Sequence, residues 1–272
     1  MIFSARSMIL TAVRLSIAAL VIAPTIVRSQ NADDVKNTAA YAALSFTPVG
    51  ALPPLLTRSM AGGPAASGGS AGQGLQPQLV LRYGRGTLGF DNAGDNAHVN
   101  AFGLTGLLSA GEAATLSATV GMLDPDCTDC ESQWMFSVGG DVALGGSQLG
   151  REVGAPRLTL GLNGELGYTS KNEMRRLSLT AGVPVALVAA SGAMKVVPFL
   201  TPSIGYGRSR FDAGQSEEGA FRFLLGGGVS VLNVASALSI NVGFQKVFWS
   251  VDTGLGTVSS KMLFGVGVTV GR

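Results

Sequence analysis

The sequence predicts an all-β protein: a transmembrane antiparallel up-and-down β-barrel of about ten strands, preceded by a signal peptide and a Gly/Ala/Ser/Pro-rich linker. Three observations lead to this prediction. Apolar and polar residues alternate in repeated stretches from residue 78 onward. The connections between these stretches are alternately short and long. Only 13% of the 272 residues are charged, whereas 46% are hydrophobic and 39 are glycine.

This composition excludes several other classes of protein. A solvated helical bundle or a disordered chain carries more charge, since about 25% charged residues is usual in soluble domains. Removing Arg6, Arg14 and Arg28 with the signal peptide lowers the basic count from 19 to 16, against 17 acidic residues. The mature chain therefore has no positive net charge to attract nucleic acid. One histidine and two cysteines leave little material for a metal-dependent or histidine-based enzyme.

Residues 1–29 have the features of a secretory signal peptide. They contain no acidic residue, and Arg6 precedes an apolar stretch at 15–23. The small residues Val27 and Ser29 fit positions −3 and −1 of a cleavage site. The alternative is a membrane anchor, but a spanning helix needs about 20 apolar residues, more than this stretch provides.

Residues 30–76 differ from the rest of the chain. Pro48, Pro53 and Pro64 interrupt any long element, and residues 61–74 are nearly all Gly, Ala and Ser. Such a composition buries too little apolar surface to offset the loss of chain entropy. We therefore expect a low-complexity linker in the periplasm.

Residues 77–272 form the predicted barrel domain. In its last stretch the apolar residues Val266, Val268 and Val270 alternate with Gly267 and Thr269, the period of a strand with two unlike faces. The ten predicted strands lie near 78–86, 97–108, 112–123, 132–145, 156–169, 174–189, 193–208, 218–233, 236–250 and 258–271.

Two features fit this pattern less well. Pro198 and Pro202 each remove a ladder donor from the stretch 193–208, which weakens the prediction of a regular strand there. The connection at 146–154 should be a short one and is long.

The connections nevertheless fall into two sets. The short ones lie at 109–111, 190–192 and 233–235. The longer, polar ones lie at 90–96, 124–131, 170–173, 209–217 and 250–257. Short turns on one rim and longer loops on the other are typical of an outer-membrane barrel with both termini in the periplasm.

Aromatic residues gather at the long-loop ends of the predicted strands. Amphipathic rings favour a membrane–water interface, so we interpret them as an interface girdle. The alternative is that aromatic residues simply favour strand ends in any β-protein. The girdle residues are Tyr83, Trp134, Tyr168, Tyr206, Phe221, Phe223, Phe248 and Trp249.

With its alternating strands and Gly-rich stretches such as 202–207, the chain resembles small bacterial outer-membrane β-barrel proteins (porin-like). The resemblance implies contact with outer-membrane lipids and insertion by the barrel-assembly machinery. Members often end in an aromatic residue that assists insertion. This chain departs from that pattern, because it ends in Gly271 and Arg272.

Polar and charged residues on the less apolar strand faces are the candidate lumen network. They are Arg82, Asp141, Arg157, Asn163, Glu165, Arg176, Arg222 and Lys261. Charges in a low-dielectric interior must pair or be hydrated. They form either a network that fills and stiffens the barrel or the selectivity filter of an open pore. Basic residues outnumber acidic ones in this set, so an open pore should favour anions.

Two further features contain residue types that can bind metals or react: a pair of cysteines and a single histidine. Cys127 and Cys130 lie in a predicted external loop, and export favours a small disulfide ring between them. Two thiols make a poor zinc site, and the flanking acidic residues do not match an EF-hand loop, so we expect no metal. His98, the single histidine, lies near Asp91 and Asp95, but no Asp-x-His or His-x-Ser arrangement surrounds it.

The sequence therefore predicts an exported outer-membrane barrel with a structural or narrow-pore role, without a cofactor or a catalytic site. One alternative is an outer-membrane barrel enzyme acting on lipid or peptide, which requires a serine or acidic partner beside His98. The other is a secreted soluble β-protein used for adhesion, which a continuous apolar outer belt would exclude.

Overall fold

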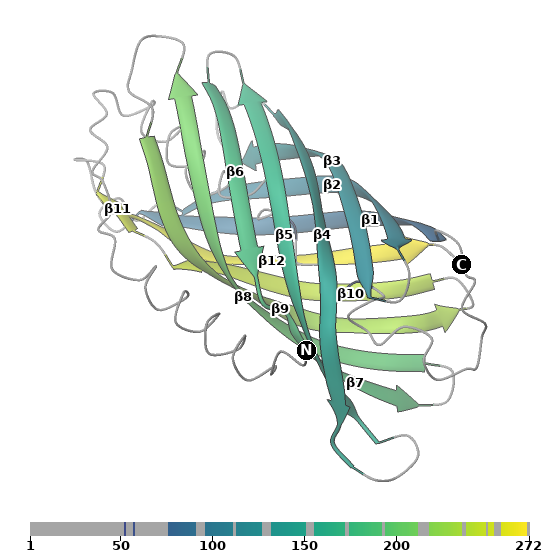
Figure 1. Cartoon of the computed structure of the whole chain (residues 1–272). Coiled ribbons are helices and arrows are strands. Elements are labelled where there is room, and N and C mark those ends of the chain that lie inside the picture. Colours follow the sequence, from purple (N-terminus) through teal and green to yellow (C-terminus); the bar gives the residue numbers. More distant parts are fainter. Residues whose placement is uncertain are drawn as a thin grey trace.

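The computed structural model in Figure 1 shows the strands wrapped into one closed barrel. The structure describes Leu52, Thr57 and residues 76–90, 96–110, 113–126, 132–150, 155–171, 174–191, 194–211, 218–235, 238–248, 250–252 and 257–270. The signal peptide and most of the predicted linker lie outside the described residues. In the part of the chain that is described, no helix is long and apolar enough to cross a membrane.

Every helix or strand element in the described part of the chain is a β-strand, and the bounds lie within a few residues of the predicted ones. The strands are β1 (Gln76–Phe90), β2 (Asn96–Ala110), β3 (Ala114–Asp126), β4 (Gln133–Gln148), β5 (Arg157–Lys171), β6 (Met174–Gly182), β7 (Val185–Ser191), β8 (Met194–Phe211), β9 (Glu218–Ala235), β10 (Leu238–Phe248), β11 (Ser250–Asp252) and β12 (Thr257–Val270).

Antiparallel pairing between β1 and β12 closes the sheet. It runs from Leu79 opposite Val270 to Phe90 opposite Val258. Elsewhere each strand pairs with its neighbours in the chain, with β6 and β7 both lying between β5 and β8. Because β6 with β7 and β10 with β11 each fill one position, the twelve segments form ten barrel strands. The predicted fold class and strand number are confirmed.

The two faces of the sheet are the reverse of those in a soluble protein. Outward side chains are large and apolar, as shown by Leu81 and Phe264, each 60% exposed. Their inward neighbours are polar and buried, as shown by Arg82 at 5% and Asn241 at 2%. The same alternation continues around the barrel, so a continuous apolar surface faces outward, as hydrocarbon requires.

The three prolines near the middle of the barrel lie where the ladder is interrupted. The strand predicted at 174–189 is broken between β6 and β7, where Pro184 has no N–H to donate. The Val183 N–H donates to the carbonyl of Pro202 at 2.9 Å, which bridges the break. On its other side β8 pairs with β9 through both Pro198 and Pro202. The stretch with two prolines therefore does form a strand.

A bulge at Gly145 interrupts the ladder between β4 and β5, ahead of the long connection that joins them. The register between β4 and β5 shifts between Ala143 and Gly145. Gly145 has a φ of 151°, which a residue with a Cβ rarely adopts. Beyond the bulge β4 continues to Gln148 and extends past its neighbours (Figure 1).

The inverted faces give a stability prediction for a matched pair of variants. Leu162 points outward and is 45% exposed, whereas Gln245 lines the lumen. Leu162→Arg places a charge in hydrocarbon and should lower the free energy of unfolding in lipid vesicles by about 2–4 kcal/mol. Gln245→Arg places the same group among polar side chains and should cost less. Urea unfolding followed by fluorescence measures both variants, and a larger loss for Gln245→Arg would contradict the assigned faces.

Candidate functional site: the barrel lumen

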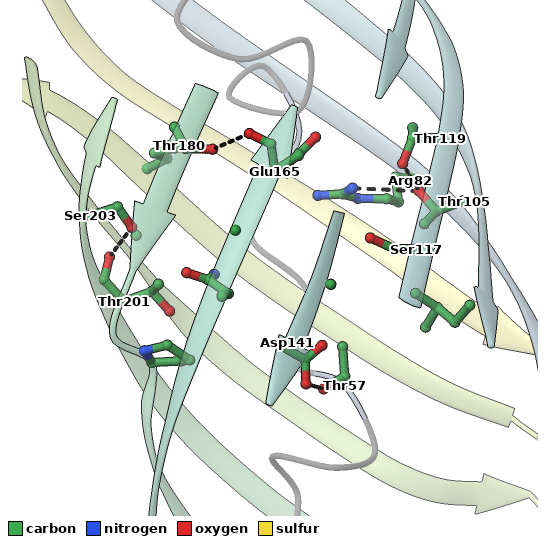
Figure 2. Close-up of a pocket in the computed structure, with 17 residues that line it drawn as sticks. Thr57, Arg82, Thr105, Ser117, Thr119, Asp141, Glu165, Thr180, Thr201 and Ser203 are labelled. Carbon is green, nitrogen blue, oxygen red and sulfur yellow. Dashed lines mark hydrogen bonds between the residues drawn. The ribbon is translucent and has the colours of Figure 1, made fainter. Parts of the chain in front are cut away.

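A small polar cavity occupies the middle of the lumen (Figure 2). Its volume is about 110 Å³. This is smaller than the apolar cavity of about 150 Å³ that accepts benzene in another protein, and it has room for a few water molecules. Its lining comes from most strands of the barrel and includes Arg82, Thr105, Ser117, Thr119, Asp141, Asn163, Glu165, Thr180, Thr201, Ser203 and Gln245. This cavity therefore leaves little open space among the side chains that line it.

Arg82 and Glu165 face each other across this cavity. Figure 2 shows the Arg82 guanidinium extending from β1 toward Glu165 on β5, and their charges interact. Arg82 Nη1 also donates to the Thr105 hydroxyl at 3.5 Å, and that hydroxyl lies 2.8 Å from the hydroxyl of Thr119. Ser137 lies within hydrogen-bonding reach of the Glu165 carboxylate. Hydroxyl groups of Thr105 and Ser137 therefore reach the pair directly, and Thr119 contacts one of them.

Arg176 and Arg222 form a second charged group, closer to the long-loop ends of their strands. Both side chains are buried in the lumen, and their like charges interact. Gly207, on the strand between them, leaves room for the Arg176 side chain: a Cβ on this glycine would lie 2.9 Å from a guanidinium nitrogen. The loop side of the lumen therefore carries two neighbouring guanidinium groups.

Asp141 binds a side chain from outside the barrel domain. The Thr57 hydroxyl donates to Asp141 Oδ2 at 2.6 Å, and both residues are buried. Asp141 lies opposite Thr115, near the start of β3 and hence toward the short-turn rim. Thr57 thus supplies a hydrogen bond to a carboxylate that is buried in the lumen.

Leu52 occupies the lumen nearer the long-loop rim. It is fully buried and packs in an apolar cluster with Val99, Ala101, Leu123 and Met135. A Cβ on Gly103 would collide with the Leu52 side chain, so glycine at this position makes the space that Leu52 fills. Two side chains from ahead of β1 therefore lie inside the barrel at two levels.

Sequence reasoning missed both of these residues. It placed Leu52 and Thr57 in a linker, because the surrounding composition lacks strand periodicity. One signal was present: residues 51–56 form a short apolar stretch within an otherwise small-residue segment. The period-2 pattern of a barrel strand does not indicate what lies in the lumen.

The structure brings most of the predicted lumen residues together. Arg82, Asp141, Asn163 and Glu165 line the cavity. Arg176 and Arg222 lie beside it in the lumen, whereas Arg157 is half-buried on the inward side at the short-turn end of β5. Lys261 lies on β12, and its side chain is outside the described residues.

The predicted girdle residues lie near the long-loop rim. Trp134, Tyr168, Phe221, Phe223 and Phe248 are exposed on the outer face, while Tyr83 and Tyr206 are half-buried there. Three ring pairs link neighbouring strands: Tyr83 with Phe102, Tyr206 with Phe221, and Phe223 with Phe248, with ring centres 4.8–5.4 Å apart. Trp249 lies outside the described residues.

The rim near His98 carries acidic residues on the next strand. The register places His98 opposite Asp126 and Asn100 opposite Asp124. Ser132 donates its hydroxyl hydrogen to Asp124 at 2.7 Å. Cys127 and Cys130 lie outside the described residues, so their disulfide stays a prediction. Among the described residues, no three His, Cys, Asp or Glu side chains gather to hold a metal ion.

Comparisons with known proteins return solved barrel structures. The transport unit of the autotransporter AIDA-I from Escherichia coli is 10% identical, with a TM-score of 0.44, over 89% of this chain and all of that one. The β domain of the Bordetella autotransporter BrkA is 13% identical, with a TM-score of 0.44, over 74% of this chain and all of that one. The outer-membrane protease OmpT from Escherichia coli is 8% identical, with a TM-score of 0.34, over 73% of this chain and 96% of that one.

At these identities and scores the likeness says nothing about what this chain binds or does. No family model matches the sequence. No curated protein matches it either. The assignment to the outer-membrane type of barrel rests on the closed antiparallel ladder and the apolar outer face.

The Arg82–Glu165 pair gives a prediction for a double-mutant cycle. Either Arg82→Gln or Glu165→Gln leaves the other buried charge less well compensated, so the two losses should not add. We expect a coupling energy of about 0.5–3 kcal/mol between them. Arg222→Gln with Glu165→Gln is the control cycle, and its effects should add within about 0.5 kcal/mol. Equal coupling in both cycles, measured by urea unfolding in vesicles, would show that the lumen charges do not act as a specific pair.

Proposed function

We propose that this outer-membrane β-barrel is a narrow, anion-favouring passage for small solutes, kept almost closed by Leu52 and Thr57. The observation that carries the proposal is the group of arginines inside the barrel. Arg82, Arg176 and Arg222 are all buried in the lumen, whereas the described inward carboxylates are Asp141 and Glu165. One carboxylate interacts with Arg82 and the other binds Thr57, whereas Arg176 and Arg222 lie together nearer the loop side.

The size of the cavity supports a narrow passage over a wide channel. Ten strands enclose far less space than the 16–18 strands of the wide channels. The side chains of Leu52 and Thr57 take up part of that space, so the unobstructed lumen is wider than the cavity that remains. Their removal should therefore widen the passage without changing the barrel wall.

An enzyme acting on lipid or peptide is the second candidate, and one observation favours it. The register places the acidic residue Asp126 opposite His98 near the long-loop rim. Against it, the hydroxyl of Ser132, a described serine near this rim, is already bonded to Asp124. The passage is the better-supported function because it uses the buried charges of the lumen.

Planar-bilayer recording tests the passage. The full mature chain should give a small conductance, and replacing Leu52 and Thr57 by alanine should increase it severalfold. Anions should carry most of the current, because arginines outnumber carboxylates among the described side chains of the lumen. Arg222→Gln should reduce the anion preference, whereas Arg85→Gln removes the same charge from the outer face and should leave it unchanged.

The outcomes separate the alternatives. A barrel that stays silent with both Leu52 and Thr57 replaced would refute the passage and leave a structural role. A current carried mainly by cations would refute the assignment of the arginines as its selectivity-determining groups.

A further inference from the structure

Charged side chains on the outer face of the barrel are distributed unevenly between its two ends. Four exposed cations lie near the long-loop ends of their strands: Arg85, Arg175, Arg208 and Lys246. On the same face and rim, Asp124 is half-buried and bonded to Ser132. At the short-turn rim, the outward side chains whose exposure is described are uncharged. The outer wall is therefore basic at the long-loop rim alone, as far as its described side chains show.

Two of these cations lie next to each other. Arg175 on β6 is opposite Arg210 on β8, and Leu177 is opposite Arg208. Arg175 and Arg208 are therefore diagonal neighbours on one face, with backbones about 7–8 Å apart, within reach of a shared ligand for side chains of this length. An anion held between these two positions could interact with both guanidinium groups. Guanidinium groups suit a phosphate, which they bind in a bidentate manner.

The wall below the two arginines is apolar. Leu177 and Leu179 are 52% and 54% exposed and continue the outward face of β6 toward the middle of the membrane. Tyr168 lies opposite Leu177 on one side, and Tyr206 lies opposite Leu179 on the other. The Tyr206 ring contacts that of Phe221 at 4.8 Å between centres. The two arginines at the rim therefore lie directly above an apolar wall that is flanked by aromatic rings.

We propose that Arg175 and Arg208 form a binding site for the phosphate headgroup of a membrane lipid, whose acyl chains lie over Leu177 and Leu179. Charge complementarity identifies the headgroup as anionic. The apolar wall and the aromatic rings at the interface identify the occupant as a lipid and not a free anion. The site lies on the outer wall, so it is independent of the passage through the lumen.

Native mass spectrometry of the purified mature chain in neutral detergent tests this site. The probe is short-chain phosphatidic acid, with inorganic phosphate as the competitor. Wild type should retain the lipid, and Arg175→Gln with Arg208→Gln should weaken its apparent affinity about tenfold or more. Lys246→Gln is the matched control, because Lys246 has the same charge and height but lies alone beside Phe248, 5.3 Å from its ring. It should change the affinity less than twofold. Heat-modifiable gel mobility checks that each variant is folded.

Three results would overturn the proposal. Undiminished lipid binding by the folded double variant would show that the two arginines do not form the site. An equal loss of lipid affinity in Lys246→Gln would show that any positive surface charge has this effect and that the two arginines form no specific site. Displacement of the lipid by an equimolar amount of inorganic phosphate would show that the pair binds free phosphate and makes no use of the apolar wall. A smaller loss of lipid affinity in each single variant, Arg175→Gln and Arg208→Gln, than in the double variant would support a phosphate shared by the two arginines.

Discussion

The closing ladder between β1 and β12 is the interaction on which the rest of the structure depends. A strand can cross hydrocarbon only if all its backbone donors and acceptors are paired, because each unpaired group there costs several kcal/mol. The pairing from Leu79–Val270 to Phe90–Val258 removes the two edges that an open sheet would leave. It also joins the two ends of the domain, so the barrel can be completed only after the last strand is in place. The ladder tolerates local irregularities provided that neighbouring groups replace the lost bonds, as Val183 does beside Pro184.

Closure determines the chemistry of the two faces. The outward face must match lipid, so leucine, valine and aromatic side chains occupy it, and polar side chains are left to the inside. The inside then has the opposite problem, because its charges are largely removed from water. The charges of Arg82 and Glu165 are compensated by their interaction with each other and with hydroxyl groups. The Asp141 carboxylate accepts a hydrogen bond from Thr57, a residue that precedes the barrel strands in the chain. The lumen therefore has a polar core that is satisfied in part by the chain's own N-terminal side.

Most of the fold could be predicted from the sequence, because the alternation of apolar and polar residues along a barrel strand shows which side chains face lipid and which face the lumen. The ten strands and the faces of residues such as Leu162 and Glu165 follow from that period. The bulge at Gly145 could not be predicted, because it depends on the register of a neighbouring strand. The break at Val183–Pro184 has a local cause, because Pro184 lacks an N–H, but the alternation on either side of it predicted one continuous strand over 174–189. The positions of Leu52 and Thr57 could not be predicted for a different reason. They depend on the space that Gly103 leaves and on a carboxylate more than 80 residues away in the chain, and neither produces a local pattern.

Spin-label accessibility along β12 tests the central claim most directly. Single labels at residues 266 to 269, in a chain whose two cysteines are replaced by serine, would be compared in lipid vesicles for contact with oxygen, which partitions into hydrocarbon. The closed membrane barrel predicts high oxygen contact at Val266 and Val268 and low contact at Gly267 and Thr269. The reverse alternation, or none, would contradict a barrel whose apolar face is turned toward lipid.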